Sequence, residues 1–263
     1  MSRKLKRENR GDTIDRENLL RILRQCHLGG ALAECVLEID GGDASVKLID
    51  ITNTITISSK IKVGSDSLDA ELGLGNLDII IKFLSSLDDK KLSFDNKKDH
   101  ILELGRKDKK RKLMYLLTRP ELIVTRIEKE YKSKFKSLEK EMEYSIELDE
   151  KVIRDLLSYV GTIKEKGMVL RVVEVKGKNV LSIIYGNPNE HQFEVILDKN
   201  FKDAEGEEFD IYLNSEFIAK ILGAVEYDED EMPTLAFSDS ELPVMIKGKN
   251  TVYFITPITE VPF

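Results

Sequence analysis

The chain has 263 residues, of which 41% are hydrophobic and 34% charged, and its formal net charge at pH 7 is −7. A chain of this length and apolar content can bury one large or two medium hydrophobic cores, and we expect two domains. The acidic balance gives no general affinity for polyanions, and no apolar run is long enough to cross a bilayer.

The first 12 residues are polar and strongly basic, without apolar periodicity. We expect a flexible tail here, with contact to a polyanion as the alternative. After a first helix, short runs of alternating or β-branched apolar residues, separated by turn residues, predict strands. In the first half these are Cys35–Ile39, Val46–Ile49, Thr54–Ile61, Leu68–Leu72, Leu92–Phe94, Ile101–Leu104 and Leu113–Leu117.

A capped amphipathic helix recurs four times along the chain. In each copy a short alternating strand runs into an Asp or Asn, whose side chain can accept hydrogen bonds from the free N–H groups of a helix start. Apolar residues then stand three, four, seven and eight positions after the cap, on one face at the helical period. The caps are Asp15, Asn76, Asp149 and Asn214, and only Asn18 breaks the apolar pattern. Four copies at intervals of about 60–70 residues indicate a duplicated unit.

The pattern changes between residues 119 and 142. The apolar cluster Leu122–Val124 precedes a run rich in Lys and Glu, which predicts a connector with a solvated helix. The second half then repeats the first. Its predicted strands after the third cap are Val169–Val175, Val180–Ile184, Phe193–Leu197, Phe209–Leu213, Thr234–Phe237, Val244–Ile246 and Val252–Ile255.

This order of elements predicts an α+β fold with two tandem domains. Each domain holds two β-α-β-β-β units, with the helices on one face of mainly antiparallel sheets. We place the domains at residues 13–118 and 143–263, joined by a connector at 119–142. A helix packed on a sheet needs only one apolar face, so the opposite face of each helix is free for a ligand.

A basic residue stands five or six positions after each cap, on the face opposite the apolar stripe. For any single residue an ordinary solvated helix face is the alternative, and acidic residues share these faces. Recurrence in an acidic protein favours one basic surface suited to sequence-independent phosphate contact. With their basic neighbours the candidate residues are Arg16, Arg21, Arg24, Lys82, Lys151, Arg154 and Lys220. The basic segment Arg106–Lys112 is either a solvated hairpin or a second phosphate contact.

The sequence carries no motif of an enzyme or a metal site. It has no P-loop, no G-x-G-x-x-G after a strand, no C-x-x-C and no H-E-x-x-H. The three histidines are scattered, and the acidic run Asp228–Glu231 lacks the register of a calcium loop. We therefore expect no catalytic residue, metal or cofactor. Two cysteines, Cys26 and Cys35, are too few for a disulfide framework and fit a reducing compartment.

The N-terminus lacks the apolar segment of a signal peptide. We expect an intracellular protein of the cytoplasm or nucleus, or of the host cell if the chain is viral, with no membrane partner.

The stretch Pro233–Pro257 resembles the closing strands of the DNA polymerase sliding clamps of the proliferating-cell nuclear antigen type, a family that includes phage clamps. In that family a proline opens one strand, and the last strand ends in an aromatic, an aliphatic and a small residue before proline. Here these are Phe254, Ile255, Thr256 and Pro257. Two tandem pairs of β-α-β-β-β units in about this length are also the plan of that family.

The resemblance implies a ring of six similar domains, so that three copies of a two-domain chain would close it as a homotrimer. Helices would line the hole, duplex DNA would pass through it, and the sheets would form the outer wall. An ATP-dependent clamp loader would open the ring. The resemblance further implies that the chain is no enzyme and that it tethers DNA polymerase and other replication enzymes through short peptide motifs.

The family's plan also implies two protein surfaces. Subunits would join edge to edge through Lys112–Leu117 and His191–Leu197, and the interface residues are Met114, Tyr115, Leu116, Leu117, Phe193, Val195 and Ile196. A pocket for apolar-aromatic peptides would lie under the connector and beside the last strand, with ordinary core packing as the alternative for each residue. Its residues are Leu122, Ile123, Val124, Ile255, Pro257 and Ile258.

The function predicted from the sequence is that of a DNA sliding clamp, a polymerase processivity factor that encircles duplex DNA. The alternative is a scaffold for protein interactions that is built from the same domains and does not form a ring. An enzyme with a diffuse polar site has little support, because no nucleophile–base or metal constellation is visible.

Overall fold

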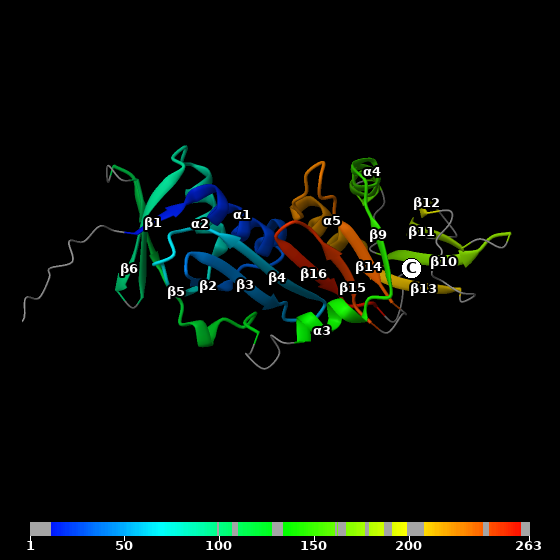
Figure 1. Ribbon diagram of the computed structural model, residues 1–263, viewed down its shortest axis with the longest axis horizontal. Coiled ribbons are helices and arrows are strands. Elements are labelled where there is room, and N and C mark those ends of the chain that lie inside the picture. The colour runs from blue at the N-terminus through cyan, green and yellow to red at the C-terminus, as the bar shows by residue number, and fades with distance from the viewer. Residues whose placement is uncertain are drawn as a thin grey trace, which may run out of the picture. The chain divides into compact units, whose positions relative to one another are not determined.

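A computed structural model describes residues 12–98, 100–106, 110–127, 134–160, 162, 167–176, 179–186, 191–198, 208–238 and 242–258. Short helices alternate with groups of strands along the chain (Figure 1), and the described strand pairs are antiparallel. The predicted α+β fold class is confirmed. The basic tail predicted at residues 1–12 lies outside the described residues except for Asp12, which begins a strand. No described helix is long and apolar enough to span a membrane.

The described residues of the first half form eight strands and two α-helices, with two single turns of 3₁₀-helix. In order they are β1 (Asp12–Asp15), α1 (Arg16–His27), η1 (Leu28–Gly30), β2 (Cys35–Asp40), β3 (Asp43–Ile49), β4 (Ile55–Lys62), β5 (Ala70–Leu74), α2 (Leu77–Ser85), β6 (Lys91–Lys98), β7 (Ile101–Gly105), β8 (Lys112–Leu116) and η2 (Pro120–Leu122).

The second half repeats this order after one extra helix. It forms α3 (Lys134–Glu141), β9 (Tyr144–Glu147), α4 (Glu150–Val160), β10 (Gly167–Glu174), β11 (Asn179–Gly186), β12 (Gln192–Asp198), β13 (Phe209–Asn214), α5 (Ser215–Ala224), β14 (Thr234–Phe237), β15 (Val244–Lys247) and β16 (Thr251–Ile255). Both halves thus carry the predicted β-α-β-β-β order twice.

The chain divides into two compact units. The first spans residues up to 23, 33–46 and 60–123, and the second spans 24–32, 47–59 and 124–263. Segments 24–32 and 47–59 therefore group with the second half of the chain. The domain limits expected from the sequence, 13–118 and 143–263, stay a prediction.

All four predicted helix caps are confirmed. In each case the side-chain oxygen of the cap accepts a hydrogen bond from the backbone N–H three residues later. The pairs are Asp15 with Asn18 at 2.9 Å, Asn76 with Ile79 at 3.3 Å, Asp149 with Val152 at 2.7 Å, and Asn214 with Phe217 at 3.4 Å. A cap of this kind stabilises a helix by about 1 kcal/mol, which matters for helices of only two to three turns.

The buried stripe of these helices is narrower than the sequence pattern suggests. The residue four positions after each cap is buried in all four helices: Leu19, Ile80, Ile153 and Ile218. Two residues assigned to the apolar face, Ile79 on α2 and Leu157 on α4, are 49% and 37% exposed. A helix that rests on a nearly flat sheet covers only the centre of its apolar face, so residues at the margin of the stripe stay in contact with water.

The first strand of each β-α-β-β-β unit does not pair with the other strands of its own unit. It pairs with a strand of the neighbouring β-α-β-β-β unit in the same half of the chain. In the first half of the chain, β1 leads into α1 but pairs with β6, and β5 leads into α2 but pairs with β2. The second unit has the same exchange, because β9 pairs with β14 and β13 pairs with β10. The resulting four-stranded sheets have the orders β1-β6-β7-β8 and β12-β11-β10-β13. The two β-α-β-β-β units of each half therefore exchange their first strands.

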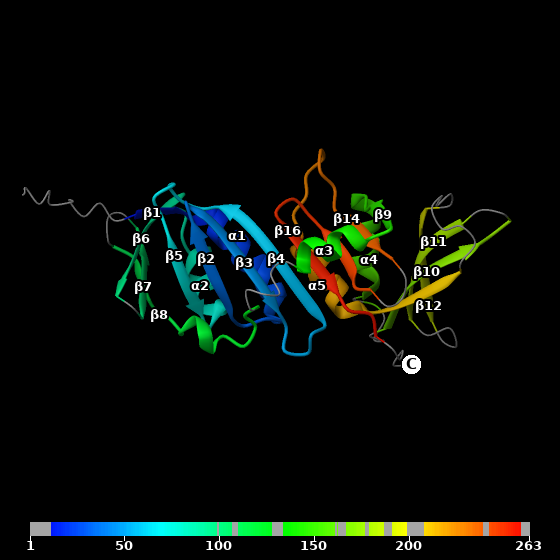
Figure 2. The same cartoon turned by 60° about the horizontal axis from the view of Figure 1, so that its bottom comes forward.

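In the second unit α3 and α5 cover opposite faces of the strands β14, β15 and β16 (Figure 2). The connector helix α3 inserts Phe135 against Ala236, Met245 and Phe254, and the Phe135 and Phe254 rings meet edge to face at 5.9 Å. On the other face, α5 residues share a small apolar cavity with alternate residues of the same strands, such as Leu235. The charged connector therefore contributes a helix to the core of this unit.

A tight turn between β2 and β3 organises one end of the first unit. Gly42 has φ of 76°, its N–H donates to Leu68 O at 2.9 Å, and its carbonyl accepts from Val63 N at 2.8 Å and Gly64 N at 3.0 Å. A Cβ at this position would lie 2.4 Å from Ser65 O. Only glycine fits this turn, because both the left-handed backbone and the close approach of the next loop exclude a side chain.

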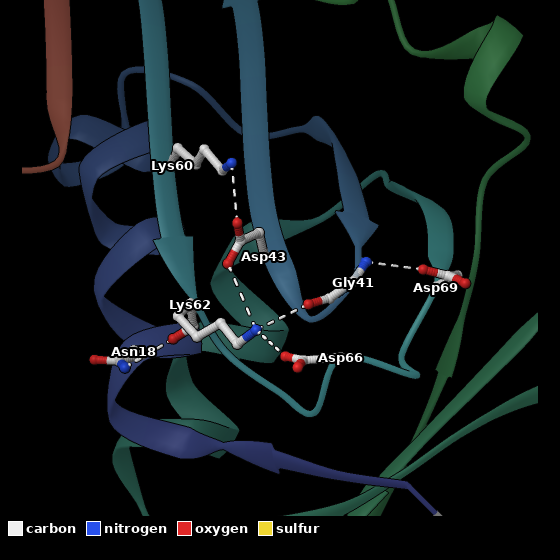
Figure 3. A network of polar contacts seen from close by, with 7 residues as sticks. All are labelled: Asn18, Gly41, Asp43, Lys60, Lys62, Asp66 and Asp69. Atoms are coloured by element: carbon white, nitrogen blue, oxygen red, sulfur yellow. Dashed lines mark hydrogen bonds and ion pairs between the residues drawn. The ribbon is translucent and has the colours of Figure 1, made fainter.

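Hydrogen bonds of polar and charged side chains connect the same turn to the surrounding loops and connect β4 to α1 (Figure 3). Lys62 Nζ donates to Gly41 O at 2.9 Å and to an Asp66 carboxylate oxygen at 2.5 Å, and this hydrogen bond to the carboxylate raises the pKa of Lys62. The Gly41 N–H donates to Asp69 at 2.9 Å, and the Asn18 side-chain amide of α1 donates to Lys62 O at 2.9 Å. The start of α1 is therefore held by the end of β4.

Substituting the two glycines of this turn separates backbone strain from steric exclusion. Gly41 has φ of 54°, but the nearest atom to an added Cβ is Asp66 O at 3.9 Å. We expect Gly41→Ala to lower the free energy of unfolding by about 1–2 kcal/mol, the cost of a left-handed alanine. Gly42→Ala adds the clash with Ser65 O, and we expect a further loss of about 1–3 kcal/mol. Urea unfolding followed by circular dichroism measures both, and equal losses would contradict the close approach at Gly42.

Candidate nucleic-acid and subunit interfaces

Helix α1 carries three of the seven basic residues predicted to face nucleic acid. Arg16 is half-buried, and its guanidinium donates to Asp89 O at 3.1 Å and to Leu84 O at 3.2 Å. Arg16 therefore caps the carbonyl end of α2 and holds the two helices of the first unit together. Arg21 is half-buried and Arg24 is exposed.

The basic residues of the other three helices lie on the outer helix faces. Lys82 on α2 and Lys151 on α4 are exposed. Arg154 Nη2 on α4 lies 2.9 Å from Glu150 Oε1, and the two side chains are 71% and 69% exposed. Exposed pairs of this kind contribute little stability, so Arg154 can exchange its carboxylate for another anion at small cost.

Helix α5 has the same arrangement. Lys220 Nζ lies 2.8 Å from Glu216 Oε1 and 6.0 Å from the centre of the Phe217 ring. These pairs lower the net charge of the outer helix faces. Together the four helices α1, α2, α4 and α5 hold seven basic and five acidic side chains, a net of two positive charges, and α1 alone accounts for that excess. The helix surface is weakly basic within an acidic protein.

The two predicted joining strands, β8 and β12, lie at sheet edges. β8 ends the order β1-β6-β7-β8 and β12 begins the order β12-β11-β10-β13, so within the described chain each pairs with a neighbour on one side only. Exposed apolar side chains mark both edges: Met114 and Leu116 on β8 are 53% and 72% exposed, and Ile196 on β12 is 45% exposed. An exposed apolar edge strand is a site for pairing with another chain.

The other predicted interface residues are less exposed. Leu117, Phe193 and Val195 are half-buried, and the Phe193 ring stacks on Tyr159 of α4 at 4.4 Å. Tyr115 is buried, where its hydroxyl accepts from Asn76 N at 2.7 Å and donates to Asn76 O at 2.9 Å. Burial raises the pKa of Tyr115. This tyrosine therefore fixes the start of α2 from inside the unit.

Another pair of edges is joined inside the second unit. β16 pairs antiparallel with β4, from Thr251 opposite Ser59 to Ile255 opposite Ile55. A buried polar cluster lies at this junction: Gln25 Oε1 accepts from Thr251 Oγ1 at 2.7 Å and from Ser59 Oγ at 2.9 Å. The Tyr253 hydroxyl also donates to Gln25 O at 3.3 Å. These hydrogen bonds to Gln25 form in only one register, so they fix how the two strands align, although the buried Gln25 Nε2 has no hydrogen-bond partner.

The predicted peptide pocket combines buried and exposed residues. Ile123 and Ile255 are buried, 3% and 0% exposed, and pack inside the fold. Leu122 of the first unit is 67% exposed and Val124 of the second is 75% exposed. Pro257 and Ile258 of the second unit are half-buried, and Ile258 N donates to Tyr212 O at 2.8 Å.

Sequence reasoning missed Ile51, a 78% exposed apolar residue in the turn between β3 and β4. Backbone hydrogen bonds join this region to the connector and the C-terminal segment, since Ile49 N donates to Thr125 O at 3.0 Å and Thr256 N donates to Thr54 O at 2.9 Å. The only signal in the sequence was an isoleucine among polar turn residues, which helix and strand periodicity does not detect.

The described residues contain no group of three or more His, Cys, Asp or Glu side chains placed to share a metal ion. No protein-family model matches the sequence, and no functionally characterised protein matches it by sequence comparison.

Solved structures do match, over nearly the whole chain. A DNA polymerase sliding clamp from Pseudomonas aeruginosa aligns with a TM-score of 0.71 at 14% identity, covering 97% of this chain and 69% of its own. The DNA polymerase III beta subunit from Thermotoga maritima aligns with a TM-score of 0.69 at 14% identity, covering 98% of this chain and 68% of its own. A Helicobacter pylori beta clamp gives 0.68 at 15% identity, with 95% and 63% covered. The chain has the fold of the DNA polymerase sliding clamps.

The clamp fold is shared although the sequences differ at about six of every seven aligned positions. The chain spans 63–69% of the length of these clamps. The clamp fold agrees with the family resemblance of the closing strands, and it places the helices and sheet edges described above in a known architecture.

Proposed function

We propose that the protein is a DNA sliding clamp that closes into a homotrimeric ring around duplex DNA. The observation that carries this proposal is the pairing of β4 with β16 inside the chain, while β8 and β12 remain as edges. Unpaired apolar edges invite association, and a closed ring would pair β8 of each copy with β12 of the next.

The two edge strands hold the same places in the duplicated chain as the two strands that pair. β4 is the third strand after α1 and β12 is the third strand after α4. β8 is the third strand after α2 and β16 is the third strand after α5, and they share a Tyr-apolar-apolar-Thr sequence at Tyr115–Thr118 and Tyr253–Thr256. By this duplication β8 of one copy pairs with β12 of the next as β16 pairs with β4.

Three copies of a two-domain chain would supply the six domains that the family's ring contains. The clamps in the comparison are about half as long again as this chain, which fits a difference in the number of domains per chain.

The helix faces contribute the contact with DNA. Their net charge of two positive charges supports a weak, long-range attraction to the phosphates, without base contacts. Arg154 can leave Glu150 for passing phosphates, because an ion pair between two exposed side chains is worth little. Weak contacts of this kind permit sliding, whereas a strongly basic surface would hold DNA in place.

The clamp would act without bond-making chemistry, as a moving tether for other enzymes. Ile51, Val124, Pro257 and Ile258 of the second unit form the candidate surface for apolar-aromatic peptides of DNA polymerase and other replication proteins. Their backbone segments are joined as described above, so the apolar side chains are presented by a fixed support. An ATP-dependent loader would open the ring.

The solution mass tests ring formation. We expect light scattering over a range of concentrations to give three times the chain mass of 30.0 kDa. Met114→Lys with Leu116→Lys should yield folded monomers, because both side chains are already exposed and the charges oppose pairing along β8. Ile51→Lys with Val124→Lys is the matched control: it places two charges at exposed apolar residues outside β8 and β12 and should stay trimeric. A wild-type monomer at every concentration would contradict the ring and favour the scaffold.

Charge reversal on the helices tests their role in DNA contact. Changing Arg21, Lys82, Arg154 and Lys220 to Glu turns the net charge of the four helices from two positive to six negative charges. We expect binding to a fluorescent duplex, measured by anisotropy at low salt, to be lost while the circular dichroism spectrum and the trimer mass are kept.

A control variant carries the same change of total charge away from these helices. It changes four exposed lysines of the strands, the turns and α3 to Glu: Lys60, Lys140, Lys176 and Lys247. This variant should bind the duplex nearly as the wild type does. Equal loss in both variants would show that total charge, and not the helix surface, controls binding.

A further inference from the structure

The connector helix α3 covers an apolar face of the second unit. We call it the α3 face, and its residues come from β3, the connector, β14, β15 and β16: Ile49, Ile127, Ala236, Met245, Val252 and Phe254. Phe135 of α3 packs on this face and is 6% exposed. Leu138, three residues later, and Met142 pack against the same cluster and are half-buried. An aromatic and an aliphatic side chain on the same side of a helix therefore cover the α3 face.

The α3 face continues into the candidate peptide surface. Ile49, the last residue of β3, precedes the 78% exposed Ile51 by two positions. Phe254, in β16, precedes the half-buried Pro257 by three positions. Covered and exposed apolar residues therefore follow each other along both segments, so the face under α3 extends the surface already proposed to bind peptides.

Helix α3 is anchored more weakly than the helices on the other face of these strands. Of the α3 side chains that the structure describes, Phe135 alone is buried. By contrast, α4 buries Ile153 and Leu156, and α5 buries three apolar side chains. With eight residues, α3 is also too short to be a stable helix without its tertiary contacts. A helix that depends on one buried side chain can be displaced by a segment that binds the same face more tightly.

The charge of α3 is a poor match for its surroundings. Its sequence, KFKSLEKE, holds three lysines and two glutamates, a net of one positive charge. Lysines also border the α3 face: Lys47 Nζ lies 5.5 Å from the centre of the Phe135 ring, and Lys247 Nζ lies 3.6 Å from Glu139 Oε2. Glu147 of β9, in the same row of the sheet as Lys247, offsets one of these charges. A segment with acidic residues in place of the α3 lysines would therefore be attracted more strongly.

We propose that α3 is an autoinhibitory helix, which covers a docking face and leaves it when an acidic segment of a partner protein binds there. The partner segment would be an amphipathic helix with an aromatic residue, an aliphatic residue three positions later, and acidic residues where α3 carries lysines. The inference rests on the tethering role in the proposed function, and it adds that partners bind by displacing part of the chain itself. Without a partner the apolar face stays covered, which limits nonspecific association.

Peptide binding to a chain with a weakened α3 tests this inference. The probe is a fluorescein-labelled peptide with the sequence of residues 134–142, in which the three lysines are changed to glutamate. In the protein, Phe135→Ala removes the buried anchor of α3. Burying a phenylalanine is worth about 10- to 100-fold in an equilibrium constant. We therefore expect the dissociation constant of the peptide, measured by fluorescence anisotropy, to fall at least about tenfold relative to the wild type.

Controls separate an uncovered face from general instability. Phe217→Ala truncates a half-buried aromatic residue of α5, on the opposite face of the same strands (Figure 2), and should bind the peptide as the wild type does. A peptide with alanine in place of its phenylalanine should not bind the Phe135→Ala chain. The peptide with the natural α3 sequence should bind that chain at least about threefold more weakly than the acidic peptide, because each exposed charge pair is worth up to a few-fold.

Hydrogen exchange followed by mass spectrometry tests displacement in the wild-type chain, so it decides the question even if Phe135→Ala does not fold. At a saturating concentration of the acidic peptide, the backbone amides of α3 should exchange faster, because the displaced helix loses the contacts that keep it folded. The amides of β16 should stay as protected as before.

The outcomes separate this inference from the proposed ring. Equal peptide affinity of the folded Phe135→Ala chain and the wild type, or α3 amides that stay protected at saturation, would show that α3 is a fixed part of the core and would overturn the inference. Tighter binding together with faster exchange of α3 supports it. The solution mass decides the ring: a monomer with both effects overturns the ring and keeps the docking face, whereas a trimer with neither effect keeps the ring alone.

Discussion

The backbone pairing of an edge strand from one half of a duplicated chain with an edge strand from the other is the interaction on which the rest of this structure depends. Inside the chain it joins β4 to β16, where a buried Gln, Ser and Thr fix the register. In the duplicated chain, β8 corresponds to β16 and β12 corresponds to β4, and both β8 and β12 carry exposed apolar side chains. In the proposed ring, the second junction of this duplicated fold would form between two copies, with β8 of one paired to β12 of the next.

The four helices α1, α2, α4 and α5 pack in the same way and have a similar balance of surface charge. Each is short, capped at its first turn and buried along a narrow stripe, so most of its circumference faces away from the sheet. The charges on those outer faces nearly cancel, with Glu150 beside Arg154 and Glu216 beside Lys220. In the proposed ring, the closed topology would retain the protein on DNA, and the weakly charged helix surface would let it move along the duplex. A strongly basic lining would increase affinity at the expense of sliding.

The amino-acid sequence predicted the local structure well, because local structure here rests on short-range physics. Caps such as Asp149 and Asn214 satisfy N–H groups only three residues away, and alternating strands bury one face whatever their partners are. The exchange of first strands, with β1 on β6 and β5 on β2, was out of reach because alternation does not name the partner strand. For the same reason Arg16 read as a surface cation, whereas its guanidinium binds carbonyls of residues about 70 positions away. Ile51 gave no periodic signal, and the placement of Phe135 in a core depended on where the connector folds back.

Threading onto linear DNA tests ring closure around DNA most directly. The protein is incubated with duplexes fixed to beads at one end, the free ends are then blocked by a bulky protein, and retention is measured after a high-salt wash. If the chain encircles DNA, it stays on blocked linear DNA at salt concentrations that abolish surface binding. It leaves when a restriction enzyme removes the block, and it does not load on closed circles. Salt-sensitive release from blocked and unblocked DNA alike would contradict encirclement and would leave a surface-binding protein with a clamp fold.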